Sequence, residues 1–259
     1  MKTETPVQRK TVQKISAAQR LKEHFAFQFS RLKNECGIPE LVFMLVSSAL
    51  MVYTLISTLK NDLAAPLVLA TALNMIATFT VPVFAMIFPR SFFLGRLSVK
   101  TQVYFDLLIV LGSFFCYGFS MYKYVAEYDK WQHFFSGFIV VFLGAELMKT
   151  FFKNKKVEPA FGLIGGVGLS FAVIVIWELF EFTADFFIAG STNQGYNYGF
   201  DEKLLFIKIF GHGAGNEGQY PLFDTIFDMM AAAVGIAVAA AVFIVIMKIK
   251  EKMKETKEA

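Results

Sequence analysis

Six long apolar runs constrain the fold of this 259-residue chain more than any other feature. A membrane-spanning helix needs about 20 mainly apolar residues. The runs that qualify cover residues 39–59, 64–88, 103–126, 132–152, 161–187 and 222–247. They make the chain 56% hydrophobic, whereas soluble domains are usually about 45–50% apolar. The pattern predicts an all-α membrane protein with about six transmembrane helices.

Lysine and arginine are distributed unevenly among the segments that connect these runs. Of the 25 lysines and arginines, 20 lie in residues 1–38, 89–102 and 149–158 and in the tail from Lys248. Six successive crossings place these four segments on one side of the membrane. Cytoplasmic segments carry an excess of basic residues. We therefore expect cytoplasmic N- and C-termini and a multi-pass protein of the cell (plasma) membrane.

The predicted runs divide the chain into three parts. These are a basic cytoplasmic segment at 1–38, a transmembrane domain at 39–248 with a long extracytoplasmic loop at 188–221, and a charged cytoplasmic tail at 249–259. The lipid bilayer is the expected partner, and nothing in the sequence indicates nucleic acid. The glycine-rich stretch "GHGAGNEG" in the loop follows no phosphate-loop pattern.

The N-terminal segment contains a stretch with its own helical pattern. In residues 15–33, apolar side chains such as Leu21, Phe25 and Phe29 recur near helical spacing, with basic residues between them. This pattern is typical of an amphipathic helix on the anionic inner leaflet. The alternative is a helix that is simply exposed to water.

Acidic residues interrupt three of the runs. The segment "IWELFEFTADFF", residues 176–187, carries Glu178, Glu181 and Asp185, although each carboxylate costs a few kcal/mol in hydrocarbon. Residues three, four or seven apart share a helix face. The same spacing occurs in two other pairs, namely Asp129 with His133 and Asp224 with Asp228. Each of the three helices should therefore carry one polar stripe.

The depth of these stripes can be counted from the inner ends of the helices, at about 1.5 Å per residue. His133 lies roughly 24 Å above Lys149, Glu178 roughly 25 Å above Phe161, and Asp228 roughly 30 Å above Lys248. Since the hydrocarbon core is about 30 Å thick, the stripes should meet near the outer boundary. By contrast, we expect Asp106 and Glu146 to pair with inner-side bases such as Lys149.

Small residues lie below the stripes, at Gly137, at Ala231, Ala232 and Gly235, and at Gly162, Gly165, Gly166 and Gly168. Small residues let membrane helices pack closely. We therefore predict a compact unit of the last three helices, with an acidic pocket open to the outside.

Clustered acids need either protonation or a cation. The carboxylates outnumber the nearby cationic candidates Lys130 and His133, and carboxylates with one imidazole suit Mg, Mn, Zn or Fe. The candidate ligands of a divalent metal ion are Glu178, Glu181, Asp185, Asp224, Asp228 and His133. Asp129 and Lys130 are further site candidates in a role other than metal ligand, or they cap the helix and form an exposed ion pair. Glu181 and His133 are the candidate catalytic bases. No HExxH or paired CxxC motif makes the metal prediction specific.

The same residues carry a family resemblance. The segments "YDKWQHFFSGF", "WELFEFTADF" and "FDTIFDMMAAAVG" resemble the YjdF-like family of uncharacterised bacterial multi-pass membrane proteins. That family shows a DKxxHFxxG element, an ExxE helix and a DTxxDM element. The matching residues here are Asp129, Lys130, His133 and Gly137, Glu178 and Glu181, and Asp224, Thr225, Asp228 and Met229. A more distant similarity is to VanZ-like proteins, from which this sequence departs by having Glu181 where they usually have glutamine. The resemblance implies an architecture and a set of residues.

Three functions remain open from the sequence. The first is binding or transport of a divalent cation or a cationic ligand in the outer pocket. The second is a membrane-embedded, metal-assisted hydrolase or transferase acting on lipid head groups, with Asp224 and Asp228 on the metal. The third is a structural or assembly role. Transporters commonly show inverted repeats and broken helices. The sequence shows neither clearly, which argues against the transport hypothesis.

Overall fold

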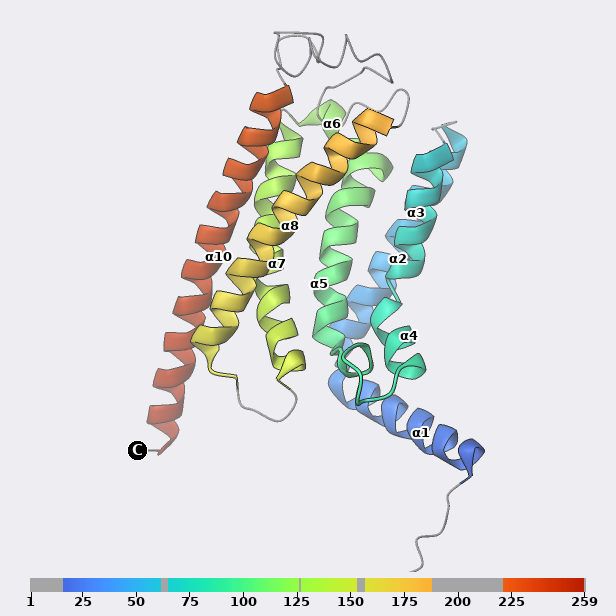
Figure 1. Ribbon diagram of the computed structural model, residues 1–259, viewed down its shortest axis with the longest axis vertical. Coiled ribbons are helices and arrows are strands. Elements are labelled where there is room, and N and C mark those ends of the chain that lie inside the picture. Colours follow the sequence, from blue (N-terminus) through green and yellow to red (C-terminus); the bar gives the residue numbers. More distant parts are fainter. Residues whose placement is uncertain (1–15, 62–64, 126, 153–156, 188–220, 259) are drawn as a thin grey trace, which may run out of the picture.

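The computed structural model describes residues 16–61, 65–125, 127–152, 157–187 and 221–258 (Figure 1). Within these residues the chain is helical apart from short connections, and it forms no strand. Five of the described helices are long and apolar enough to cross a membrane, and the number is six if a bent helix pair counts as one span. The predicted all-α membrane fold is therefore confirmed.

The helices follow one another in a simple order. They are α1 (Ala17–Glu35), α2 (Ile38–Lys60), α3 (Ala65–Ala77), α4 (Thr80–Ile87), η1 (Leu94–Arg96), α5 (Val99–Ile109), η2 (Val110–Gly118), α6 (Met121–Tyr124), α7 (Tyr128–Phe151), α8 (Pro159–Phe187) and α10 (Pro221–Glu258). The helix α1 and the C-terminal end of α10 lie at the same end of the molecule (Figure 1). The predicted loop 188–221 lies, up to Tyr220, outside the described residues.

The helix α7 is the centre of a three-helix unit, because it packs against both α8 and α10. It also packs against α5, which joins this unit to α2 and α3 on the other side of the molecule (Figure 1). The buried apolar core of the unit consists of Val141, Ile174, Ala232, Ile236 and Ala239.

Glycine makes this close packing feasible. A Cβ atom added to Gly235 of α10 would lie 2.0 Å from the carbonyl oxygen of Phe134 in α7. One added to Gly166 of α8 would lie 2.2 Å from the carbonyl oxygen of Val141. By contrast, one added to Gly168 would meet nothing within 4 Å. The predicted small-residue packing is therefore present at Gly166 and Gly235, while Gly168 takes no part in it.

The third apolar run does not form the single helix over 103–126 that the sequence suggests. It begins at Val99 as α5 and widens into the π-helix η2 at Val110. It then breaks at Ser120, whose φ of 56° is left-handed. Such a backbone conformation is uncommon for a residue other than glycine. The helix α6 and a second left-handed residue, Glu127, precede the start of α7.

The second apolar run is bent by 61° between α3 and α4. Pro82 is one cause, because it has no N–H to donate to the carbonyl four residues earlier. The side chain of Gln102 is the other. Its Oε1 accepts from the Val81 amide at 2.8 Å, and its Nε2 donates to the Ala77 carbonyl at 3.0 Å. These two backbone groups would bond to each other in an unbroken helix. The amide of Gln102 is thus inserted into the helical ladder.

Asp106 fixes the orientation of that inserted amide. Its Oδ1 accepts from Gln102 Nε2 at 2.7 Å, and both side chains are fully buried. The expected pairing of Glu146 with Lys149 is confirmed at 2.8 Å, whereas the expected pairing of Asp106 with an inner-side base is wrong. The helix pair α3–α4 is a broken helix of the kind that the sequence did not show clearly. The insertion of Gln102 could not be read from the sequence, since it depends on how α5 is rotated against α3 and α4.

We expect Gln102→Leu to lower the melting temperature of the detergent-solubilised protein. The change leaves the Ala77 carbonyl and the Val81 amide without their side-chain partner, at a cost of about 1–3 kcal/mol for each unsatisfied group. Gln19→Leu is the matched control, because Gln19 bonds only at the exposed surface of α1. Equal melting temperatures for the two variants would contradict the insertion of Gln102 into the helix.

Candidate functional site

Lys130 is the cation at the centre of the predicted acidic cluster. It lies in the first turn of α7, and the N-terminal end of this helix is at the end of the bundle opposite α1 (Figure 1). Its Nζ contacts Asp129 Oδ2 at 3.1 Å and Asp228 Oδ1 at 2.9 Å, and it also donates to Asp224 Oδ1. Asp224 and Asp228 are buried and come from α10. One lysine therefore bridges α7 to both acids of the α10 stripe.

His133 lies one helical turn further along α7 and is buried. Its Nδ1 lies 3.8 Å from Glu178 Oε1 in α8. Its Nε2 lies 3.8 Å from Asp129 Oδ1 and 3.9 Å from Asp228 Oδ1. These distances are too long for hydrogen bonds. The imidazole thus has carboxylates on both sides, and these come from three helices. Each carboxylate is farther from the ring than a hydrogen bond would allow.

The acids of α8 occupy different positions. Glu178 is buried and faces His133. Glu181 accepts a hydrogen bond from Trp177 Nε1 at 2.8 Å. Asp185 is also buried, but it does not belong to either group of candidate metal ligands found among the described residues. Sequence spacing therefore places all three acids on one face without distinguishing Asp185 from the other two.

Two groups of side chains could each hold an ion. In each group, one ligand atom per residue lies within 4.8 Å of the others. The first group is Asp129, His133 and Asp228, and the second is His133, Glu178 and Glu181. Asp224, a sequence candidate, belongs to neither and is instead bonded to Lys130.

A network of polar side chains supports the start of α7. Cys116 of η2 donates to Gln132 Oε1 at 2.9 Å, and Tyr122 OH donates to the same oxygen at 3.2 Å. Tyr122 also lies 3.3 Å from Asp129 Oδ1. Tyr128 bonds to the Leu111 carbonyl of η2 at 3.2 Å. Neither Gln132 nor Trp177 was among the site residues expected from the sequence. The available signal was spacing, because Gln132 lies three residues after Asp129, and Trp177 four residues before Glu181.

A comparison with protein-family models matches residues 39–249 to a family described as "Predicted membrane protein (DUF2238)". The chain belongs to this family. The match covers all six predicted apolar runs and every candidate site residue. It places the DUF2238 chain among membrane proteins, in contact with the lipid bilayer. No curated protein and no solved structure matches the chain significantly.

Proposed function

We propose that this DUF2238 protein binds one divalent cation with His133, Glu178 and Glu181 as its protein ligands. The observation that carries the proposal is the position of the buried His133 imidazole, whose Nδ1 lies 3.8 Å from Glu178 Oε1. Two ligands about 2.1 Å from a tetrahedral zinc ion lie about 3.4 Å apart. An ion would therefore need only a small contraction of the side chains around it.

The position of Lys130 decides between the two candidate groups. Lys130 Nζ lies within 3.1 Å of both Asp129 and Asp228, so an ion on the Nε2 side of His133 would sit beside an ammonium group. The Nδ1 side faces Glu178 and has no such competitor among the described residues. Asp129 and Asp228 would then orient the imidazole from behind, as carboxylates do for metal-bound histidines.

Three protein ligands leave one position of a tetrahedral ion open. Carboxylates with imidazole suit Zn, Mn, Fe or Mg. The open position is compatible with the alternative function, a metal-assisted hydrolase or transferase acting on lipid head groups. In that case Asp224 and Asp228 would act through Lys130 and would not bind the metal.

The structural alternative is favoured by a separate observation. Lys130 joins α7 to Asp224 and Asp228 of α10 and to Asp129 in its own helix. These four residues, which form the Lys130 half of the cluster, can hold two helices together without any ion. The two interpretations therefore apply to different halves of the cluster and make different predictions for Glu181.

We expect divalent ions to raise the melting temperature of the wild-type protein. An ion that binds only the folded state stabilises it by about 2.7 kcal/mol at a hundredfold excess over Kd. The gain should fade as the pH falls, because protons compete for the ligands. Glu181→Gln should lose most of the gain, whereas Asp185→Asn, in the next turn of α8, should keep it. Melts with Zn²⁺, Mn²⁺, Mg²⁺ and chelator at two pH values measure this. If no ion shifts the wild type and Glu181→Gln alone destabilises it, the structural alternative replaces the cation site.

We also propose that α1 and the C-terminal end of α10 face the cytoplasm and that the membrane is the plasma membrane. The support is the basic-residue distribution, together with the position of both elements at one end (Figure 1). The helix α1 leaves Leu21 and Phe29 more than half exposed, which suits contact with an anionic inner leaflet. The motif matches at Asp129–His133 and Asp224–Asp228 support kinship with the YjdF-like proteins.

Cys36, between α1 and α2, is a natural reporter of this orientation. In a Cys116→Ala background, we expect a membrane-impermeant maleimide to label Cys36 only after the cells are permeabilised. Burial and the neighbouring Glu40 raise the pKa of the Cys36 thiol, so the labelling should be run above neutral pH. A cysteine introduced at exposed Asn61, at the other end of α2, should react in intact cells. Reversed labelling of the two sites would overturn the topology.

A further inference from the structure

Asp106 is a fully buried acid that belongs to neither group of candidate metal ligands described above. Its Oδ1 accepts the hydrogen bond from Gln102 Nε2 that orients the inserted amide. Its other oxygen, Oδ2, is buried and has no hydrogen-bond partner within the described residues. Buried polar atoms are almost always paired, so an unpaired one calls for an explanation such as a bound ion or water.

The carboxyl group of Asp106 lies at the break between α3 and α4, which run beside α5 (Figure 1). Gln102 Nε2 bonds both to Asp106 Oδ1, at 2.7 Å, and to the carbonyl of Ala77, the last residue of α3, at 3.0 Å. The C-terminal end of a helix carries a partial negative charge. Pro82 also deprives the Thr78 carbonyl of its helical donor. The break therefore brings a carboxyl group to the carbonyl end of a helix.

Hydroxyl groups of α2 also lie at the break. Ser48 Oγ is 3.0 Å from Thr78 Oγ1, and each hydroxyl also bonds to a carbonyl oxygen of its own helix. The preceding residue, Ser47, is fully buried, and its Oγ has no hydrogen-bond partner in the described part of the chain. Both serines lie near the middle of the span Ile38–Lys60. These oxygen atoms are therefore deep in the membrane.

The chemistry of these groups favours a monovalent cation. Asp106 is the ionisable one among them, and the partner of its Oδ1 is the neutral amide of Gln102. A carboxylate that binds a metal ion is deprotonated. One sodium ion would neutralise it, whereas a divalent ion would leave a net positive charge in the membrane interior, where charge is costly. Asp106, Ser47 and Thr78 are each fully buried, and this enclosure favours Na⁺ over the larger K⁺.

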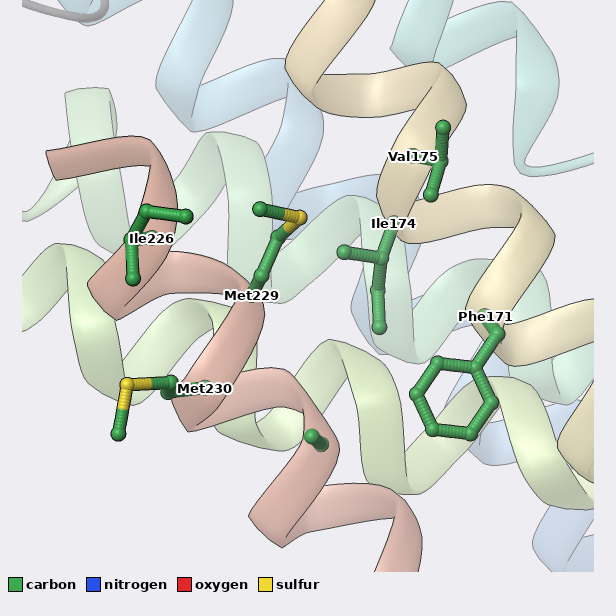
Figure 2. Close-up of a pocket in the computed structure, with 7 residues that line it drawn as sticks. Phe171, Ile174, Val175, Ile226, Met229 and Met230 are labelled. Carbon is green, nitrogen blue, oxygen red and sulfur yellow. The ribbon is translucent and has the colours of Figure 1, made fainter. Parts of the chain in front are cut away.

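A groove between α8 and α10 provides a contrast. It measures about 300 Å³, and Phe171, Ile174 and Met229 are among the side chains that line it. The side chains in Figure 2 carry only carbon and sulfur atoms. This lining offers no oxygen ligand for an ion such as Na⁺, whereas carboxyl, carbonyl and hydroxyl oxygens come together where α3 meets α4.

We infer that the break between α3 and α4 binds one sodium ion, with Asp106 Oδ2 as its charged ligand. Ser47 Oγ and the oxygen atoms of Thr78 would be its neutral ligands. Broken helices of secondary transporters bind Na⁺ through similar groups, namely unwound carbonyls and half-helix C-terminal ends near the middle of the bilayer. This site is separate from the proposed divalent site and does not depend on it.

Thermal melts of the detergent-solubilised protein test the sodium site. Chelator removes divalent ions, and choline chloride keeps the ionic strength constant. We expect NaCl to raise the melting temperature with saturation, as a ligand of the folded state does. KCl should need a several-fold higher concentration for the same shift. Asp106→Asn should abolish the shift, because its amide oxygen can still accept from Gln102 but carries no charge.

Ser47→Ala is a second variant, and it should fold because Ser47 Oγ makes no hydrogen bond within the described residues. It should raise the Na⁺ concentration needed for half of the shift by several-fold. Ser57→Ala is the matched control. It removes the same atom from α2, at a hydroxyl that bonds to Asn61 at the exposed end of the helix, and it should respond to Na⁺ like the wild type.

Three results would overturn the inference. The first is an equal response to Na⁺, K⁺ and choline, which a buried water molecule in place of the ion would give. The second is a Na⁺ shift that persists in Asp106→Asn or, if that variant does not fold, an unchanged response in Ser47→Ala. The third is loss of the Na⁺ shift in the double variant Glu178→Gln with Glu181→Gln, which would move the ion to the acidic cluster. We expect this double variant to keep the Na⁺ shift.

Discussion

Lys130→Met is expected to cause one of the two largest losses of stability in this protein. The lysine is the only side chain cation in contact with Asp224 and Asp228 among the residues that the structure describes. Both acids are buried. Removing one partner of a buried ion pair costs about 3–5 kcal/mol, because the remaining charge is uncompensated. For a chain of this size, such a loss lowers the melting temperature by roughly 10 °C.

Lys149→Met is the control for this variant. Lys149 also pairs with an acid, Glu146, but its side chain is 62% exposed. Exposed pairs contribute about 0–1 kcal/mol, so the control should melt close to wild type. A double variant, Lys130→Met with Asp228→Asn, should recover part of the loss. Equal melting of the Lys130 and Lys149 variants would show that Lys130 does not hold α7 to α10.

Gly235→Leu is expected to cause the other large loss of stability. Its Cβ would lie 2.0 Å from the Phe134 carbonyl oxygen, and backbone atoms cannot move aside as a flexible side chain can. The helices α7 and α10 would have to separate. Overpacking a well-packed core costs about 1–3 kcal/mol and occasionally more, and a clash with backbone belongs at the upper end. We expect little folded protein after purification, as judged by gel filtration in detergent.

Gly168→Leu provides the matched control, because it adds the same side chain to open space on α8. It should purify like the wild type. Gly235→Ala distinguishes the effect of a large side chain from the effect of the close backbone contact. It adds only the Cβ atom and should still lower the melting temperature. If Gly235→Leu purifies and melts like Gly168→Leu, the close approach of α7 and α10 is wrong.

Helical periodicity predicts which acids share a face and which lie at the same depth. The residue count puts His133, Glu178 and Asp228 near the outer boundary of the membrane. In the structure, Glu178 Oε1 lies 3.8 Å and Asp228 Oδ1 lies 3.9 Å from the imidazole nitrogens of His133. Spacing alone could not show how the three helices are rotated. For that reason the sequence did not reveal that Lys130 reaches Asp224 and Asp228, or that Asp185 lies outside both ligand groups.

Other features have no sequence signature at all. The π-helix η2 differs from an α-helix by its hydrogen-bond register, and its apolar residues suit either form. Gln102 is inserted between Ala77 and Val81, which lie 25 and 21 residues earlier in the sequence. No sequence pattern near Gln102 indicates this contact. Pro82 signals a weak point in the second run, but it reveals neither the 61° bend nor the hydrogen bonds that Gln102 makes across the break.

The metal content of the purified protein tests the central claim most directly. Wild type and Asp185→Asn, exchanged into buffer with Zn²⁺ and then freed of unbound ions, should each retain one ion per chain by elemental analysis. The double variant Glu178→Gln with Glu181→Gln should retain less than about a tenth of that, since loss of metal-site groups lowers affinity strongly. No stoichiometric ion in the wild type, or an undiminished content in the double variant, would contradict a cation site at His133, Glu178 and Glu181.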